Sequence, residues 1–156
     1  MACAVVLLIL VVGPATAKDH QVRLQITSYG DTIGWHFSKY AGPLPPRAEY
    51  IRIRFGSPIG NLRFTRILPE DDTNHRMEKG EEFDKTMSVT GPGVYVLAFP
   101  DWRHGAEVEV TLNVDGEDWF QGAGASKNMA HWTKQMNKWS RHVRQTGDRE
   151  IAFFLD

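Results

Sequence analysis

Cysteine is almost missing from this sequence. The single cysteine among 156 residues is Cys3, which lies in an apolar N-terminal stretch. A folded domain without thiols forms no disulfide, and it has no cysteine nucleophile, no cysteine-based zinc site and no thiol redox chemistry. Its stability must come from a packed core, and the chain is long enough to form one domain with such a core.

Sequence motifs of catalysis and metal binding are also lacking. The chain has no P-loop, no dinucleotide fingerprint, no Gly-x-Ser-x-Gly elbow and no closely spaced histidine pair. The acidic stretch 70–84 does not follow the order of a calcium-binding loop. His36 stands between Trp35 and Phe37, so on a strand it is expected to face away from the core into solvent. We therefore expect no catalytic residue, no metal ligand and no cofactor.

The N-terminus has the pattern of a secretory leader. Residues 4–12 are all apolar, Gly13-Pro14 follows, and Ala15-Thr16-Ala17 matches a small-x-small cleavage site. The apolar run is shorter than the roughly 20 residues of a membrane span. We expect residues 1–17 to be a signal peptide and residues 18–156 to be a single secreted or lumenal domain without N-glycosylation.

Net charge is −1, and this near balance gives no reason to expect a nucleic-acid partner. The distribution is uneven, however. Residues 70–84 hold seven acids against two bases, whereas residues 127–144 hold five bases and no acid. These blocks can complement each other within the fold or mark two faces for different partners.

Hydrophobic residues alternate with polar ones along much of the chain, which is typical of half-buried strands. Alternation is visible in residues 21–27, 32–38, 50–55, 61–67, 86–90 and 107–114, and residues 150–156 are a short apolar candidate for a last strand. Residues 94–99 are apolar throughout, as expected for a central strand covered on both faces. Turn signals separate these runs. The pattern predicts an antiparallel two-sheet β-sandwich of about seven or eight strands.

One stretch has a helical period instead. Met129, Trp132, Met136, Trp139 and Val143 recur at steps of three and four. Ser126 can cap the start of a helix, and Gly147 can follow its end. We therefore expect one C-terminal amphipathic helix over about residues 126–146, with a basic face opposite its tryptophan and methionine seam.

Two motifs together resemble the GOLD domain. "GDTIGWHFSKY" (30–40) is similar to the aromatic strand near the start of that domain, and "GPGVYVLAFPDW" (91–102), followed by "AEVEVTLNV", is similar to its later strands. The resemblance covers about residues 20–115. The cysteine pair and membrane span of the cargo-receptor type are absent here. The resemblance therefore implies a soluble β-sandwich that binds protein or lipid.

Exposed aromatic and basic side chains are the candidates for ligand or interface contacts. They fall in the loop after residue 99, after the strand at 107–114, and in the predicted helix: Trp102, Arg103, His104, Trp119, Phe120, Trp132, Lys134, Lys138, Trp139 and Arg141. A tryptophan in such a loop can cap the sandwich, stack on a sugar or enter a lipid interface.

Three functional hypotheses remain open from sequence. The leading one is a secreted, non-enzymatic binding module for a protein, lipid or glycan. The second is a membrane-active protein or toxin that makes peripheral membrane contact through the basic helix. The third is a hydrolase whose catalytic carboxylates come from distant strands. Oligomeric state is left open.

Overall fold

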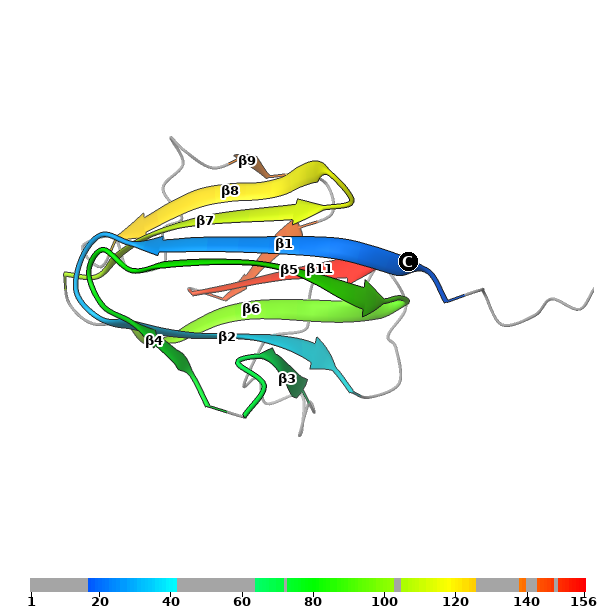
Figure 1. Ribbon diagram of the computed structural model, residues 1–156, viewed down its shortest axis with the longest axis horizontal. Helices are drawn as coiled ribbons and strands as arrows, with labels where there is room; N and C mark the ends of the chain where they lie inside the picture. The colour runs from blue at the N-terminus through cyan, green and yellow to red at the C-terminus, as the bar shows by residue number, and fades with distance from the viewer. Residues whose placement is uncertain are drawn as a thin grey trace, which may run out of the picture.

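The computed structural model describes residues 17–41, 64–71, 73–102, 105–125, 138–139, 143–147 and 149–156. Within these ranges the chain forms two antiparallel sheets, so the predicted mainly β architecture is confirmed (Figure 1). The strands are β1 (Asp19–Ser28), β2 (Ile33–Tyr40), β3 (Phe64–Leu68), β4 (His75–Met77), β5 (Glu82–Thr90), β6 (Gly93–Trp102), β7 (Glu107–Val114), β8 (Glu117–Ala125), β9 (Lys138–Trp139), β10 (Val143–Gly147) and β11 (Glu150–Leu155).

The two sheets have different sizes. Sheet A has the strand order β5-β1-β7-β8-β9, and sheet B has the order β10-β11-β6-β2-β3, with β4 paired to β2 as well. The described strands outnumber the seven or eight predicted. β4 and β9 have only three and two residues, too few for alternation to show in the sequence.

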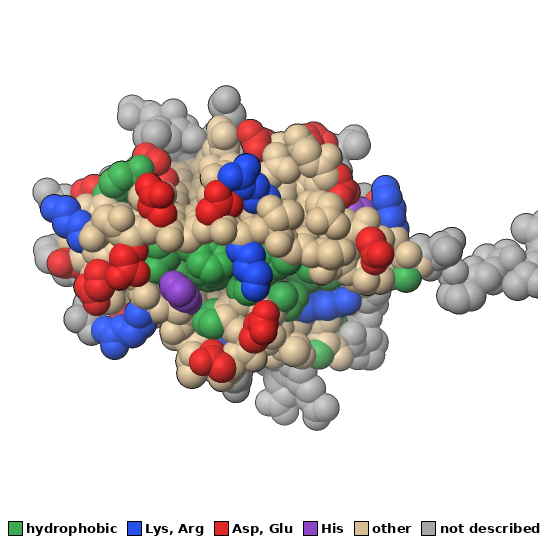
Figure 2. Space-filling model, viewed as in Figure 1, with side chains coloured by type: hydrophobic (Ala, Val, Ile, Leu, Met, Phe, Trp, Pro, Cys, Tyr) green, Lys and Arg blue, Asp and Glu red, His purple; other side chains and the backbone are tan. Residues whose placement is uncertain are grey.

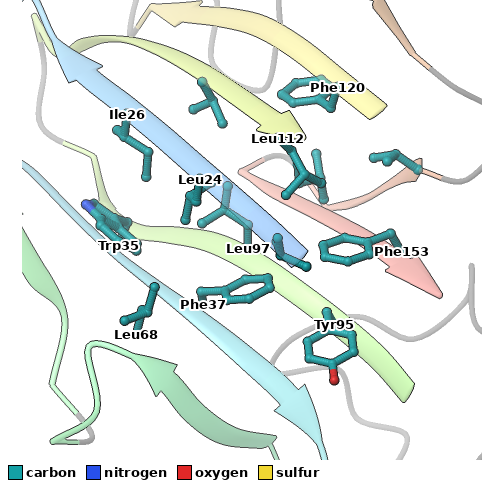
Figure 3. Close-up of a cluster of buried hydrophobic side chains, with 14 of the residues drawn as sticks. Leu24, Ile26, Trp35, Phe37, Leu68, Tyr95, Leu97, Leu112, Phe120 and Phe153 are labelled. Carbon is teal, nitrogen blue, oxygen red and sulfur yellow. The ribbon is translucent and has the colours of Figure 1, made fainter. Parts of the chain in front are cut away.

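Alternate side chains of the two sheets form one core. Leu24 and Ile26 of β1 and Leu112 of β7 face Trp35 and Phe37 of β2 across it, and all five are at most 1% exposed. Figure 3 shows these side chains pointing into the space between the sheets. Burying each such side chain contributes about 1.5–3 kcal/mol, so this core holds the two sheets together without a disulfide.

Strand β6 lies inside sheet B, between β11 and β2, as its uniformly apolar sequence predicts. Tyr95 and Leu97 point into the core between the sheets. Val94 and Val96, on the opposite face, are also fully buried and pack against Tyr40, Phe64, Phe154 and Ala152. Both faces of β6 are therefore covered, which explains why alternation is lost there.

The predicted helix is wrong for part of its length. Residues 138–139 form β9, which pairs with β8, and residues 143–147 form β10, which pairs with β11. Trp139 and Val143 of the predicted seam thus each pair with a neighbouring strand. Tertiary pairing of this kind overrides the helical spacing of the hydrophobic residues. Residues 126–137 lie outside the described residues, as does the predicted strand at 50–55.

Candidate functional site

Trp102 lies at the end of β6 and is half-buried against the core. Its ring meets Phe99 edge-on, with the ring centroids 5.5 Å apart. On its other side, a Cβ built at Gly124 of β8 would lie 2.6 Å from Trp102 Cη2. Trp102 thus packs over β8 and helps to close one end of the sandwich. Arg103 and His104 lie outside the described residues.

Trp119 and Phe120 both belong to the core, although neighbouring strand residues usually face opposite ways. The register between β7 and β8 shifts at this point, since Leu112 pairs with Phe120 and Asn113 with Asp118. Trp119 is the extra residue of this bulge. Its side chain is 8% exposed, and it meets Phe153 edge-on at 5.9 Å. Both residues therefore pack inside the sandwich.

The remaining sequence candidates are clustered near the C-terminus. Lys138 and Trp139 contribute backbone to β9, where they pair with Gln121 and Phe120. Three further candidates lie outside the described residues: Trp132, Lys134 and Arg141. Within the described residues, the predicted ligand residues therefore do not form one common surface.

A different surface emerges in the described part of the chain, where no described strand joins the two sheets along one side. Strand β5 ends sheet A, and β3 and β4 end sheet B next to it. The space between these edges is here called the open side. Hydrophobic side chains that are only half-buried line it: Ile67, Phe83 and Met87. Figure 2 looks onto this side and shows a band of hydrophobic side chains between the polar surfaces of the two sheets, with basic side chains next to it.

An aromatic cluster forms one end of the open side. The ring of Trp35 lies 4.7 Å from that of Phe83 and 5.2 Å from that of His75, and the last two rings are 5.5 Å apart. The Trp35 indole donates a hydrogen bond of 3.1 Å to Met77 Sδ. Trp35 is fully buried, so its polar atom is satisfied inside, whereas His75 and Phe83 remain half-exposed at the surface.

Two lysines occupy positions that face the core beside this apolar band. Lys85 of β5 pairs with Leu24, and Lys39 of β2 pairs with Tyr95. Both partners are core residues. Lysine is rarely found at such positions unless its ammonium group reaches water or a partner. Alternation from Phe83 through Lys85 to Met87 is the sequence signal for this edge, but the lysine interrupts the apolar pattern and so hides the strand.

Each lysine crosses from one sheet to the other. Lys85 Nζ lies 3.6 Å from Glu70 Oε1, in the turn after β3. Lys39 Nζ donates to the carbonyl oxygen of Thr90 at the end of β5, at 3.2 Å, and lies 5.7 Å from the centroid of the Tyr95 ring. The apolar band thus has one ammonium group in the middle of β5, at Lys85, and another at one end, at Lys39.

A second group of polar side chains lies on the outer face of sheet B. His36 and Ser38 are both 0% exposed, and a hydrogen bond of 3.0 Å joins His36 Nδ1 and Ser38 Oγ. Burial, with a smaller effect of the Arg66 charge, lowers the pKa of His36 from 6.5 to about 4.

The expectation that His36 faces solvent is wrong. Its side chain points away from the core between the sheets, but it is fully buried. A serine beside a neutral imidazole can form a nucleophile, yet neither side chain is accessible to a dissolved substrate here.

Among the described residues, no group of three or more histidine, cysteine, aspartate or glutamate side chains converges as a metal ion would require. No helix within the described ranges is long and apolar enough to cross a bilayer.

Comparison with known proteins finds no family model, no curated protein and no solved structure that matches this chain.

Proposed function

We propose that this chain is a secreted, non-enzymatic binding module, and that its ligand is a lipid-like molecule held at the open side. The observation that carries the proposal is the band of half-exposed hydrophobic residues between β5 and the β3–β4 edge. An apolar surface that remains partly exposed in a folded domain is a common feature of ligand-binding grooves.

The flanking surfaces favour this position. The outer face of β5 is polar and exposed at Asp84, Thr86 and Ser88, whereas Phe83 and Met87 on the opposite face are partly buried against the core. An apolar ligand would therefore find apolar side chains on both sides of Lys85, with the aromatic cluster around Trp35 at one end. The resemblance to GOLD domains also implies a protein or lipid ligand.

The membrane-active alternative rests on an uninterrupted helix across residues 126–146. Strands β9 and β10 interrupt that stretch. The open side requires no such helix, and it supplies apolar surface from described strands alone. We therefore place ligand binding there.

The test measures binding of dodecanol, a neutral apolar probe, by displacement of the fluorescent dye N-phenyl-1-naphthylamine. Met87→Asp puts a carboxylate on the open side and should abolish dodecanol binding. Ser88→Asp adds the same charge to the opposite face of the same strand and should leave binding unchanged. Both variants need a native circular dichroism spectrum. Absence of dodecanol binding to the unaltered protein, or equal effects of the two substitutions, would overturn the proposal.

A further inference from the structure

We infer that the ligand carries an acid group and that Lys85 binds it, so that the open side accepts a fatty-acid-like carboxylate. This inference rests on the proposed function, because it assigns the polar end of the same ligand. It depends on the position of Lys85, on the weakness of its present partner and on the different situation of Lys39.

The position of Lys85 is unusual for a lysine. It stands between Phe83 and Met87 on the face of β5 that is directed at the core, and it pairs with fully buried Leu24. The hydrocarbon part of a lysine can pack along apolar neighbours while its ammonium group reaches outward. A ligand lying along the apolar band would therefore meet one cation in the middle of β5.

The present partner of Lys85 is easily replaced. Glu70 Oε1 is 3.6 Å away, and the two side chains are 48% and 77% exposed. Exposed ion pairs of this kind contribute about 0–1 kcal/mol. The Glu70 carboxylate shows that an anionic oxygen can approach the ammonium group from the side of sheet B. A ligand carboxylate can take its place with little loss, and it gains apolar contacts that Glu70 does not make.

The neighbouring acid does not block this exchange. Asp71 Oδ1 accepts hydrogen bonds within its own turn, from the hydroxyl of Thr73 at 2.6 Å and from its backbone N–H at 3.3 Å. These bonds lower the pKa of Asp71, with the bond from the Thr73 hydroxyl as the largest cause. Asp71 is therefore directed into the turn, and of the described acids in this turn Glu70 is the one that lies near Lys85.

Lys39 is less suited to the same role. Its ammonium group donates to the Thr90 carbonyl oxygen and lies over the Tyr95 ring. Its stem packs on Gly93, where an added Cβ would lie 2.9 Å from Lys39 Cε. The lysine stem, the glycine and the tyrosine ring form a packed unit that closes the end of the open side. Lys39 thus serves as a comparison for Lys85.

The experiment compares dodecanoate with dodecanol, each below its micelle concentration, on the full mature chain at pH 7.5. The unaltered protein should bind dodecanoate about tenfold more tightly than dodecanol, as expected for one hydrogen-bonded charge pair. Lys85→Gln should remove this preference and leave dodecanol affinity unchanged. Glu70→Gln should strengthen dodecanoate binding several-fold, because it removes the competing carboxylate. Lys79→Gln, in the exposed turn before β5, should change neither affinity.

The possible failures are distinguishable. If dodecanol binds but dodecanoate binds no better, the acid-group inference is overturned and the proposed function stands. If Lys39→Gln removes the preference and Lys85→Gln does not, the assignment to Lys85 is overturned. If neither probe binds, both proposals are overturned. Binding to anionic phospholipid vesicles in flotation, without binding of monomeric dodecanoate, would also overturn the inference in favour of a membrane surface.

Discussion

His20 Nδ1 lies 2.6 Å from Asp115 Oδ2 and joins the start of β1 to the turn between β7 and β8. The other ring nitrogen of His20, Nε2, lies 2.9 Å from the backbone oxygen of Asp156, just after β11. Both neighbours are hydrogen-bond acceptors, so the doubly protonated ring satisfies both by donating from each nitrogen. The His20 ring therefore connects a strand of sheet A, a hairpin turn and the end of a strand of sheet B.

The first prediction concerns this ring. Burial acts to lower the pKa of His20, but the hydrogen bonds to Asp156 and Asp115 outweigh it and raise the pKa above 6.5. A raised pKa in the folded state means that the stabilisation is fully present below pH 6.5 and is lost as pH rises through the folded-state value. His20→Gln should therefore lower the free energy of unfolding at pH 6 more than at pH 8.5, as measured by urea melts. An equal loss at both pH values would contradict the prediction.

The second prediction has the opposite sign. Because burial lowers the pKa of His36 to about 4, the unfolded chain binds a proton on this ring that the folded chain does not bind between pH 6.5 and 4. Stability from His36 should thus fall as pH drops through this window, by about 3 kcal/mol in total.

The measurement for His36 compares the unaltered protein with His36→Gln in urea melts at pH 7.5, 6 and 4.5. The variant has no ring to protonate, so its unfolding free energy should fall less steeply with acid. Parallel curves for the two proteins would show that folding does not lower the pKa of His36, which would contradict the prediction.

The third prediction concerns β6. Leu97 is 1% exposed and points into the core from a strand paired on both edges. Leu97→Ala should lower the free energy of unfolding by about 2–5 kcal/mol, through lost burial and the cavity that remains. Ser88→Ala, on the exposed face of β5, should change it by less than about 0.5 kcal/mol. Similar small losses for both variants in denaturant melts would place Leu97 outside the core.

The sequence predicted β6 correctly because its signal is local: six consecutive apolar residues after a Gly-Pro-Gly turn need cover on both faces. The strand at β5 was recognised only over its last five residues, because Lys85 interrupts the apolar alternation. Lysine is compatible with that position only because the sandwich is open beside it, and this depends on which strands end each sheet. No single segment contains that information.

Other features depended on long-range pairing in the same way. The spacing of Trp139 and Val143 fits a helix, but both residues find partners in β8 and β11, which are distant or later in the chain. Trp119 and Phe120 were both predicted as surface candidates because they follow the strand at 107–114. The bulge between β7 and β8 lets both side chains pack inside the sandwich instead, and a bulge leaves little trace in residue types.

The fourth prediction tests the contact between Trp102 and Gly124. Adding a methyl group at Gly124 would bring it within 2.6 Å of Trp102 Cη2, so the rigid ring would have to move. Gly124→Ala should lower the free energy of unfolding by about 1–3 kcal/mol. In the Trp102→Ala background the same substitution should cost much less, because the space is already free. Additive effects in the double-mutant cycle would show that the two residues do not interact.

The fifth prediction treats Lys85 as a guard of an exposed edge. Among the described strands β5 ends sheet A, and an edge of this kind could add a strand from another molecule. An inward-facing charge opposes such pairing, because a partner strand would have to cover the ammonium group. Lys85→Ile would join Phe83 and Met87 into one apolar row. We expect this variant to be a more stable monomer at low concentration and to self-associate at high concentration, as measured by denaturant melts and analytical ultracentrifugation.

Lys79→Ile is the control for this prediction. It changes the same residue type in the turn before β5, away from the row, and should remain monomeric. If Lys85→Ile and Lys79→Ile associate equally, the charge at position 85 does not protect the edge. Association of Lys85→Ile alone would show that it does.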